Sequence, residues 1–178
     1  TPASGNTSLA PGTYLVRIKA NGTLLVSESQ SITLTAYVPD EEATPAAIFT
    51  ATGADIGMLS DVANGMKYRI DTGAWIDITD STVISLTNLS ACTIEVVKKG
   101  NGTTTADSPA QEVAVTKADT PALTATQPST IGGNGSIPMT TNHEYRSEAD
   151  STWTPASGNT SLAPGTYLVR IKANGTLL

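Results

Sequence analysis

The chain begins and ends with the same stretch. TPASGNTSLAPGTYLVRIKANGTLL occupies residues 1–25 and recurs letter for letter at 154–178, an offset of 153 residues (154 − 1). Unrelated segments of this length do not agree at every position by chance, so the identity is a true repeat. Exact repeats indicate a tandem array in which each repeat is one supersecondary unit. Whatever fold the first copy adopts, the last copy has the residues to adopt it too.

A second, diverged duplication lies inside the first. Placing Thr44-Pro45 over Thr120-Pro121, an offset of 76 residues (120 − 44), aligns most of the chain with itself apart from one-residue slips. The matched positions are Tyr68 with Tyr145, Arg69 with Arg146, Trp75 with Trp153, 89–94 with 162–167, 101–103 with 174–176, and 30–35 with 111–116. The chain therefore contains two alternating kinds of repeat, which we name A and B.

The predicted organisation has five parts. They are the closing segment of repeat A (1–38), a linker (39–43), the complete repeat B (44–116), a linker (117–119) and the opening segment of repeat A (120–178). Both linkers lead into Thr-Pro, and proline stiffens the chain on either side of itself, so we expect rigid joints. The opening segment lacks the strand that contains Ile32 and Leu34 in the closing segment. We expect the printed chain to be one window of a longer array.

Short alternating runs separated by turn residues dominate repeat B. Strands are predicted at 46–52, 67–70, 75–78, 82–86, 93–99 and 112–116, with 56–62 either a strand or a short helical turn. Within 93–99, Ile94 and Val96 should face inward and Val97 outward. Asn-Gly at 101–102 and 174–175 predicts type I′ hairpin turns. Six to seven strands in about 76 residues predict an antiparallel β-sandwich.

The composition limits the classes of partner that the chain is expected to bind. The formal net charge is −6, which argues against nucleic acid and anionic membranes. The sequence has no run of 18 apolar residues for a membrane span and no opening signal peptide. Its one cysteine, Cys92, excludes an intramolecular disulfide, and we interpret it as a small, partly buried residue rather than a reactive thiol.

A family resemblance rests on the pattern Tyr-Arg, Trp-Thr, then Leu-Ala-Pro-Gly-Thr-Tyr-x-Val-Arg-x-Lys-Ala. This pattern resembles the immunoglobulin-like or fibronectin III-like repeats of bacterial cell-surface and S-layer-associated proteins. The resemblance implies tandem extracellular β-sandwiches used as spacer, stalk or adhesive modules. Repeat B departs from the pattern, with Ala91-Cys92 in place of Pro-Gly and Ile94 in place of the tyrosine.

Few residues suggest chemistry. The only histidine, His143, cannot assemble a histidine metal site or a Ser-His-Asp triad alone, and we expect it at the surface or at a strand end. Asp40, Glu41 and Glu42 lie in one linker, where carboxylates can hold calcium; the alternative is a solvated acidic turn. No other cofactor is predicted.

Four aromatic residues recur between the repeats, namely Tyr68, Tyr145, Trp75 and Trp153. They can form a platform for sugars, but their recurrence favours packing that every copy needs. Glycoside hydrolysis needs two carboxylates facing across a cleft, and nothing in the sequence places such a pair.

Seven asparagines stand in Asn-x-Ser/Thr and can accept a glycan in a glycosylating compartment. They are Asn6, Asn21, Asn88, Asn101, Asn134, Asn159 and Asn174. The alternative is that abundant Ser and Thr produce the pattern, since Asn-Gly-Thr is also a good turn. A Lys–Asn isopeptide crosslink is not expected, because no buried Lys/Asn/acid trio is evident.

The sequence thus predicts a non-enzymatic, extracellular structural protein of the cell surface, a segment of a stalk or filament. Its predicted partner is itself: the Ile32/Leu34 strand of one copy completes residues 120–178 of another, by covalent continuation or by strand donation. The alternative is a carbohydrate- or protein-binding adhesin with exposed aromatics on one face. An enzyme would need a polar constellation shared by both repeats, and the shared positions are mostly apolar or turn residues.

Overall fold

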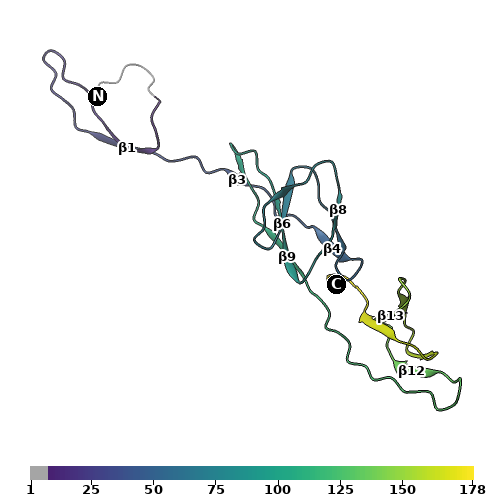
Figure 1. Cartoon of the computed structure of the whole chain (residues 1–178). Coiled ribbons are helices and arrows are strands. Elements are labelled where there is room, and N and C mark those ends of the chain that lie inside the picture. The colour runs from purple at the N-terminus through teal and green to yellow at the C-terminus, as the bar shows by residue number, and fades with distance from the viewer. Residues whose placement is uncertain (1–7) are drawn as a thin grey trace. The chain divides into compact units, whose positions relative to one another are not determined.

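The computed structural model describes residues 8–178, which form strands and turns and no helix (Figure 1). The chain divides into two compact units, Thr1–Asp40 and Glu41–Leu178. The boundary between the units falls inside the predicted linker 39–43, whereas repeat B and the opening segment share one unit. The pairings between strands are antiparallel, which confirms the predicted all-β class.

The described residues of the first unit contain one hairpin. Strand β1 (Gly12–Val16) pairs with β2 (Gln30–Leu34), and every residue of β2 is exposed. Between the strands, the backbones of Asn21 and Leu24 bond to each other at 3.0 and 3.3 Å and enclose Gly22, whose φ is 57°. The turn is therefore centred on Gly-Thr. Asn174 and Leu177 bond to each other in the same way, so the predicted Asn-Gly centre at 174–175 was wrong. Glycine takes the first central position because φ is positive there.

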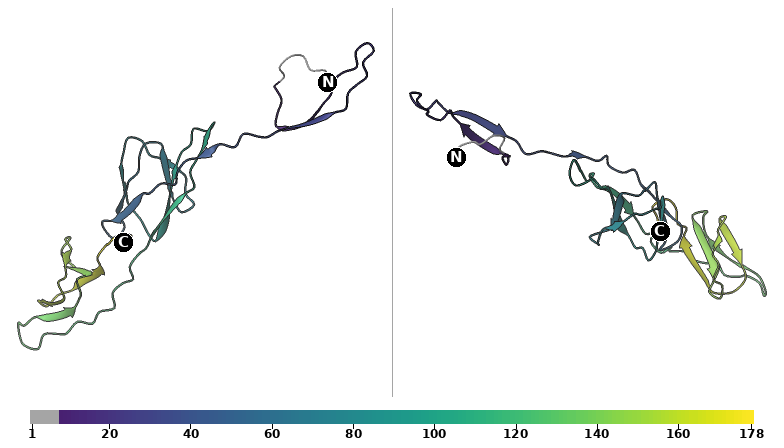
Figure 2. Two further views of the ribbon diagram at one scale, coloured as in Figure 1. Left: turned by 180° about the vertical axis from the view of Figure 1, so that it is seen from behind. Right: turned by 90° about the horizontal axis from the view of Figure 1, so that it is seen from above.

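Repeat B is a sandwich of two sheets. Its strands are β4 (Ile48–Ala51), β5 (Gly57–Ser60), β6 (Met66–Ile70), β7 (Ile76–Asp77), β8 (Val83–Leu86), β9 (Cys92–Lys98) and β11 (Gln111–Val115). One sheet has the order β4-β5-β8 and the other β11-β9-β6-β7. Figures 1 and 2 draw repeat B in blue to teal. The ambiguous segment 56–62 is a strand. Two short strands, β3 (Asp40–Glu41) and β10 (Thr105–Ala106), accompany them, and the Glu42 N–H donates to the Ala106 carbonyl at 3.2 Å.

The core lies between the two sheets. Leu59, Ile94 and Val96 are fully buried, and for Ile94 and Val96 the alternation of polar and apolar residues along β9 predicted this. Phe49 also points inward, and it packs so closely that a Cβ on Gly57 would lie 2.2 Å from its ring. Glycine is required at this position because the neighbouring strand presents an aromatic ring where a side chain would go.

The outer face of the second sheet is also covered. Val97 lies on the face opposite Ile94 and Val96, as predicted, yet it is only 5% exposed. Its cross-strand partner is Lys67, whose Nζ reaches the Asp107 carboxylate at 2.6 Å. Long charged side chains bury their methylene stems against apolar neighbours while keeping their charge in water. Such stems can shield a valine on an outer face.

The loop after β9 differs from the predicted type I′ hairpin. Only Gly102 has positive φ (73°), and the Asn101 side-chain oxygen accepts from the N–H groups of Thr103, Thr104 and Thr105 at 2.8 to 3.0 Å. The side chain of Asn101 therefore holds this loop in shape, whereas a type I′ turn does not require side-chain hydrogen bonds.

The opening segment of repeat A repeats much of this plan. Its strands are β12 (Gly135–Pro138), β13 (His143–Ser147), β14 (Thr154–Pro155), β15 (Asn159–Leu162) and β16 (Tyr167–Ile171). They form the sheets β12-β15 and β14-β13-β16. A single bridge from Thr126 to Ser136 replaces the β4–β5 ladder.

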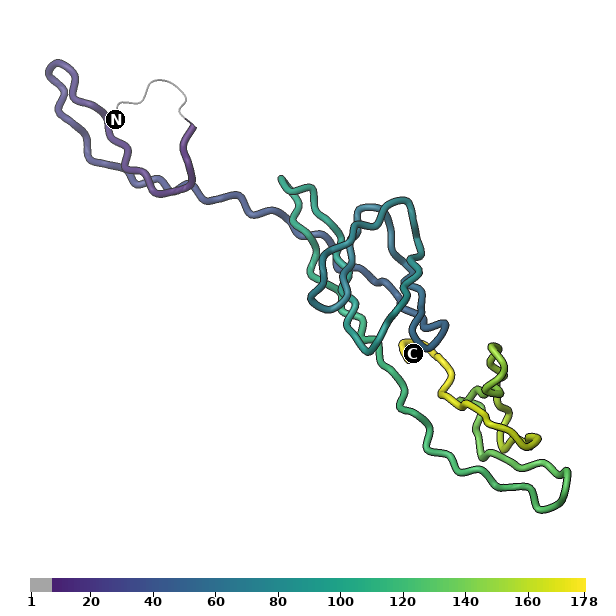
Figure 3. The backbone as a smooth tube through the Cα atoms, viewed as in Figure 1, coloured from purple at the N-terminus to yellow at the C-terminus, as the bar shows by residue number. Residues whose placement is uncertain are grey.

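The last residues return to repeat B, as the tube in Figure 3 shows. Leu178 is 4% exposed and belongs to the repeat B core cluster. Its N–H donates to the Thr116 carbonyl at 2.8 Å, and its carbonyl accepts from Ala118 at 3.1 Å. Among the described residues, no helix is long and apolar enough to cross a bilayer.

Candidate functional site

Strand β16 has an open edge. Within the described part of the chain, β16 pairs with β13 on one side and with no strand on the other. The corresponding strand of repeat B, β9, pairs with β6 on one side and β11 on the other. An unpaired strand edge presents a row of unsatisfied N–H and C=O groups that can template another strand.

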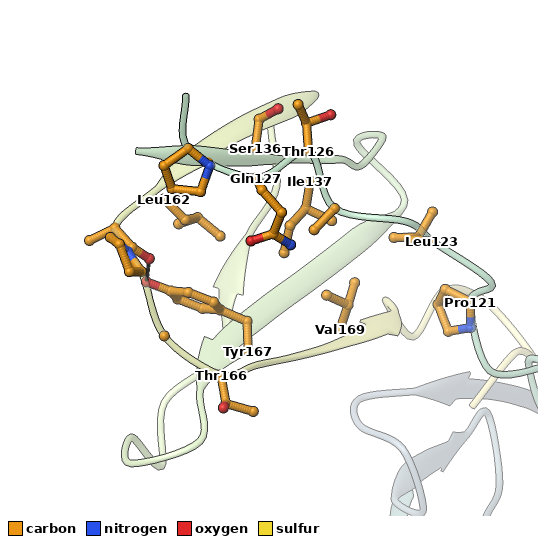
Figure 4. A pocket seen from close by; sticks show the side chains of 16 residues that line it. Pro121, Leu123, Thr126, Gln127, Ser136, Ile137, Leu162, Thr166, Tyr167 and Val169 are labelled. Atoms are coloured by element: carbon orange, nitrogen blue, oxygen red, sulfur yellow. Dashed lines mark hydrogen bonds between the residues drawn. The ribbon is translucent and has the colours of Figure 1, made fainter. Parts of the chain in front are cut away.

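A groove of about 520 Å³ lies beside this open edge (Figure 4). Residues 121–128 form one wall, and β12, β15 and β16 form the others. The Tyr167 ring, Val169 and Ile137 point into it. Tyr167 and Val169 are only half-buried, whereas their repeat B counterparts, Ile94 and Val96, are fully buried.

Two sequence differences shape this groove. The opening segment has Ala125 where repeat B has the core residue Phe49, so less side chain fills the interior from that wall. On the opposite wall, Tyr167 replaces Ile94, and its hydroxyl donates to the Ala163 carbonyl at 3.1 Å. The tyrosine is thereby held across the floor of the groove.

In repeat B the last strand closes this space and is latched to the first. The Gln111 side-chain oxygen accepts from the Ala47 N–H at 2.7 Å, and its amide nitrogen donates to the Ala47 carbonyl at 2.7 Å. One side chain thus extends the backbone pairing from β11 to the start of the first sheet. This role of Gln111 was not predicted from the sequence, although a signal is present there: glutamine opens both matched stretches, 30–35 and 111–116.

The two last strands pair in the same register. In repeat B, β11 places Gln111 opposite Val96, Val113 opposite Ile94 and Val115 opposite Cys92. In the first unit, β2 places Gln30 opposite Val16, Ile32 opposite Tyr14 and Leu34 opposite Gly12. The alignment of 89–94 with 162–167, continued without a gap, equates these two sets position by position, because residues 12–16 repeat as 165–169.

The recurring aromatic residues divide between two roles. Tyr68 is buried in the core, on the face opposite the sheet surface where Lys67 and Arg69 hold Trp75 at 5.1 and 4.6 Å. Tyr68 and Trp75 therefore do not form one exposed platform. In the opening segment Trp153 lies under Arg146 and Arg170, at 5.3 and 4.0 Å.

Each tryptophan is accompanied by a cross-strand ion pair. Arg69 bonds Glu95 at 2.7 Å in repeat B, and Arg170 bonds Glu144 at 2.6 Å in the opening segment. The second pair does not occupy the positions equivalent to the first but neighbouring ones. Its arginine lies on β16, the counterpart of β9, whereas the arginine of the first pair lies on β6. The same packing is thus built from different positions, which is expected when packing rather than a fixed chemical geometry is required.

The remaining candidate residues lie apart from one another. His143 opens β13, which is the strand end of the predicted surface or strand-end placement, and it is buried. Its Nδ1 accepts from the Thr140 N–H at 3.0 Å. The Thr140 Oγ1 lies 2.8 Å from the same nitrogen. Cys92 is a free thiol of intermediate exposure, and burial, followed by the charge of Asp71, raises its pKa.

In the predicted calcium linker, the Glu42 carboxylate bonds the Lys98 ammonium at 2.7 Å. No group of three or more potential metal-ligating side chains occurs among residues 8–178. A calcium site at Asp40, Glu41 and Glu42 stays a prediction.

The asparagines of the Asn-x-Ser/Thr motifs differ in whether their side chains are exposed or already hydrogen-bonded. Asn6 lies outside the described residues. Asn101 is occupied by its loop, because its amide nitrogen donates to Thr104 at 2.7 Å while its oxygen accepts three backbone N–H groups. The others, Asn21, Asn88, Asn134, Asn159 and Asn174, are exposed.

Neither a family model nor a curated protein sequence matches this chain. The fold class therefore follows from the strands alone. They form antiparallel sheets in a sandwich-like arrangement, and a groove lies beside the open edge of β16.

Proposed function

We propose that this chain is a non-enzymatic structural segment, part of an array of immunoglobulin-like sandwich repeats that serves as an extracellular spacer or stalk. One observation supports the proposal. The same sequence alignment also matches the strand registers of the two repeats, so the residues that the repeats share are those that form the sandwich. Tyr68 opposite Val96 corresponds to Tyr145 opposite Val169 in this way.

The polar groups of the repeats support the same interpretation. The ion pairs Arg69–Glu95 and Arg170–Glu144 brace neighbouring strands and stack on tryptophans. The positions that match between the repeats are mostly apolar or turn residues, and the one histidine, His143, belongs to one repeat only. The sheet orders β4-β5-β8 and β11-β9-β6-β7, with a tyrosine hydroxyl bonded four residues upstream in repeat A, resemble the arrangement of immunoglobulin-like sandwiches.

A mechanical experiment tests the proposal. The chain is pulled from its two ends in an atomic force microscope. Repeat B, with its 73 residues from 44 to 116, is expected to unfold in one step with a contour-length gain of about 25 nm. Gradual extension without a discrete step contradicts a load-bearing role.

A glycan array and a cell-adhesion assay with the same protein separate the proposal from the adhesin alternative. Selective binding to a defined glycan or cell surface would favour the adhesin. The mass of the native protein measures whether the Asn-x-Ser/Thr asparagines carry glycans, as they do only if the chain passes a glycosylating compartment.

A further inference from the structure

We infer that the groove beside β16 is a strand-docking site whose occupant is the Gln30–Leu34 strand of a second copy of this chain. The inference rests on the proposed array function and names the partner that completes the open repeat. It follows from the open edge, the groove and two observed pairings that specify the same register.

The register of the docked strand is fixed by β1 and β2. Because 165–169 has the same sequence as 12–16, the donated strand places Ile32 opposite Tyr167, Leu34 opposite Gly165 and Gln30 opposite Val169. The β9–β11 pairing of repeat B gives this register independently. A slip of one residue would turn Ile32 and Leu34 away from the groove, so burial opposes it.

The apolar side chains of the donor match the groove. Ile32 and Leu34 are each 39% exposed in the first unit, and their repeat B counterparts, Val113 and Val115, contact the core. Tyr14 and Ile32 share one face of the β1–β2 hairpin, as cross-strand partners do. In the docked strand that face is the one toward which Tyr167 and Val169 already point (Figure 4).

The exchange leaves the number of backbone pairings unchanged, because the β1–β2 pairing of the donor is replaced by a β16–β2 pairing and β1 is left open. The second copy's β2 leaves its own β1 and meets a strand of identical sequence, so the same residue pairs form again. What is gained is the burial of Ile32 and Leu34 against β12 and β15, which β1 alone does not offer. Exchange of identical elements between copies is a low-cost route to assembly.

A polar latch adds specificity. Gln30 occupies the position of Gln111, and Leu123 occupies that of Ala47 in the wall of the groove. We therefore assign to Gln30 of the donor the two bonds that Gln111 makes, to the N–H and carbonyl of Leu123. The latch would join the donated strand to the first strand of the opening segment.

The test is register-specific disulfide trapping in the full chain. With Cys92→Ser as background, Thr33→Cys and Thr166→Cys place cysteines at positions that pair in the docked register. The corresponding hydroxyls of Thr13 and Thr33 lie 3.1 Å apart. Mild oxidation is expected to give dimers and higher oligomers linked through 33–166, identified by mass spectrometry of the joined peptides. The matched control, Thr35→Cys with Thr166→Cys, is two residues out of register and should not link.

Two further arms identify the occupant. An excess of a peptide with the sequence of residues 26–37 is expected to suppress the oligomers, whereas the same peptide with Ile32→Asp and Leu34→Asp leaves them unchanged. Gln30→Glu in the full chain should slow trapping about tenfold, because glutamate cannot donate to the Leu123 carbonyl.

Three results overturn the inference. They are absence of the 33–166 link in protein with native tryptophan fluorescence, equal linking by the out-of-register pair, and a 33–166 link found only within monomers. None of them bears on the unfolding step that tests the spacer role, so the two proposals fail separately.

Discussion

Ile94 and Ile76 are the same residue in two very different settings. Ile94 is fully buried between the sheets of repeat B, whereas Ile76 is 50% exposed on β7. The transfer of an isoleucine side chain out of water stabilises the fold only in proportion to the apolar area that is buried. The contribution of each isoleucine is therefore set by its place on the pleat.

Ile94→Ala is expected to lower the free energy of unfolding by about 2–5 kcal/mol, through lost burial and the cavity left behind. Ile76→Ala, the matched control, should change it by less than about 0.5 kcal/mol. Urea denaturation followed by tryptophan fluorescence measures both. Equal losses in the two variants would contradict the assignment of the core.

Asp107 illustrates a residue whose contribution depends on pH. The hydrogen bond from Lys67, then that from the Gly100 N–H, lowers the pKa of this carboxyl from its ordinary 3.8. Because the folded pKa is the lower one, the stabilisation is fully present above pH 3.8 and is lost as pH falls through the folded value.

The difference in urea midpoint between the native chain and Asp107→Asn is therefore expected to stay constant from about pH 7 down to about pH 5 and to shrink below 3.8. Comparing the two chains at each pH cancels the titration of the other carboxyl groups. A difference that grows toward low pH would contradict the assigned pair.

At the scale of elements, the last strand determines whether a repeat is closed. In repeat B, β11 covers the edge of β9 and its Gln111 holds the Ala47 backbone. In the opening segment the same edge is open, and Tyr167 and Val169 stay half-buried. Closure therefore depends on one five-residue strand and one side chain.

Gln111→Glu is expected to destabilise repeat B by about 1–3 kcal/mol, because a carboxylate faces the Ala47 carbonyl and leaves it without its donor. Glu112→Gln, on the neighbouring exposed position, is the control and should change stability by less than about 0.5 kcal/mol. Thermal unfolding by circular dichroism provides the comparison. If both variants melt alike, Gln111 is not a latch.

The matched strands show which structural features were predicted from the sequence and which were not. The repeat alignment predicted the strands of both repeats and named Ile32 and Leu34 as an inter-copy strand, and β2 carries these residues. It did not predict the Gln111 latch or the burial of Val97, because each depends on a neighbour distant in sequence. It also placed the turn at 174–175 one residue early, because Asn-Gly is a strong turn signal whether it begins or centres the turn.

At the scale of the whole molecule, the duplicated tail is found in two environments. Leu178 is 4% exposed in the core cluster of repeat B, whereas Leu25, the same position of the same sequence, is 89% exposed. The difference comes entirely from what lies beside each copy. Leu178 packs against the buried apolar residues of repeat B, and its N–H donates to the Thr116 carbonyl.

Leu178→Ala is expected to reduce the stability of the second unit by about 2 kcal/mol or more. Leu25→Ala should leave it unchanged within about 0.5 kcal/mol. Both tryptophans lie in the second unit, so their fluorescence reports the stability of that unit alone. Equal effects would mean that the tail of one copy does not dock on repeat B.

The two copies of this 25-residue segment separate local from tertiary determination. Both copies form the Gly-Thr turn, with Gly22 at φ 57° and Gly175 at φ 56°, and both bond the tyrosine hydroxyl to the alanine four residues upstream. These features are decided by the sequence, since their partners lie within a few residues. Strand partners and burial differ between the copies, because backbone edges and apolar surface are satisfied by whatever distant segment the fold brings near. Only the tertiary structure made one tail a core element and left the other exposed.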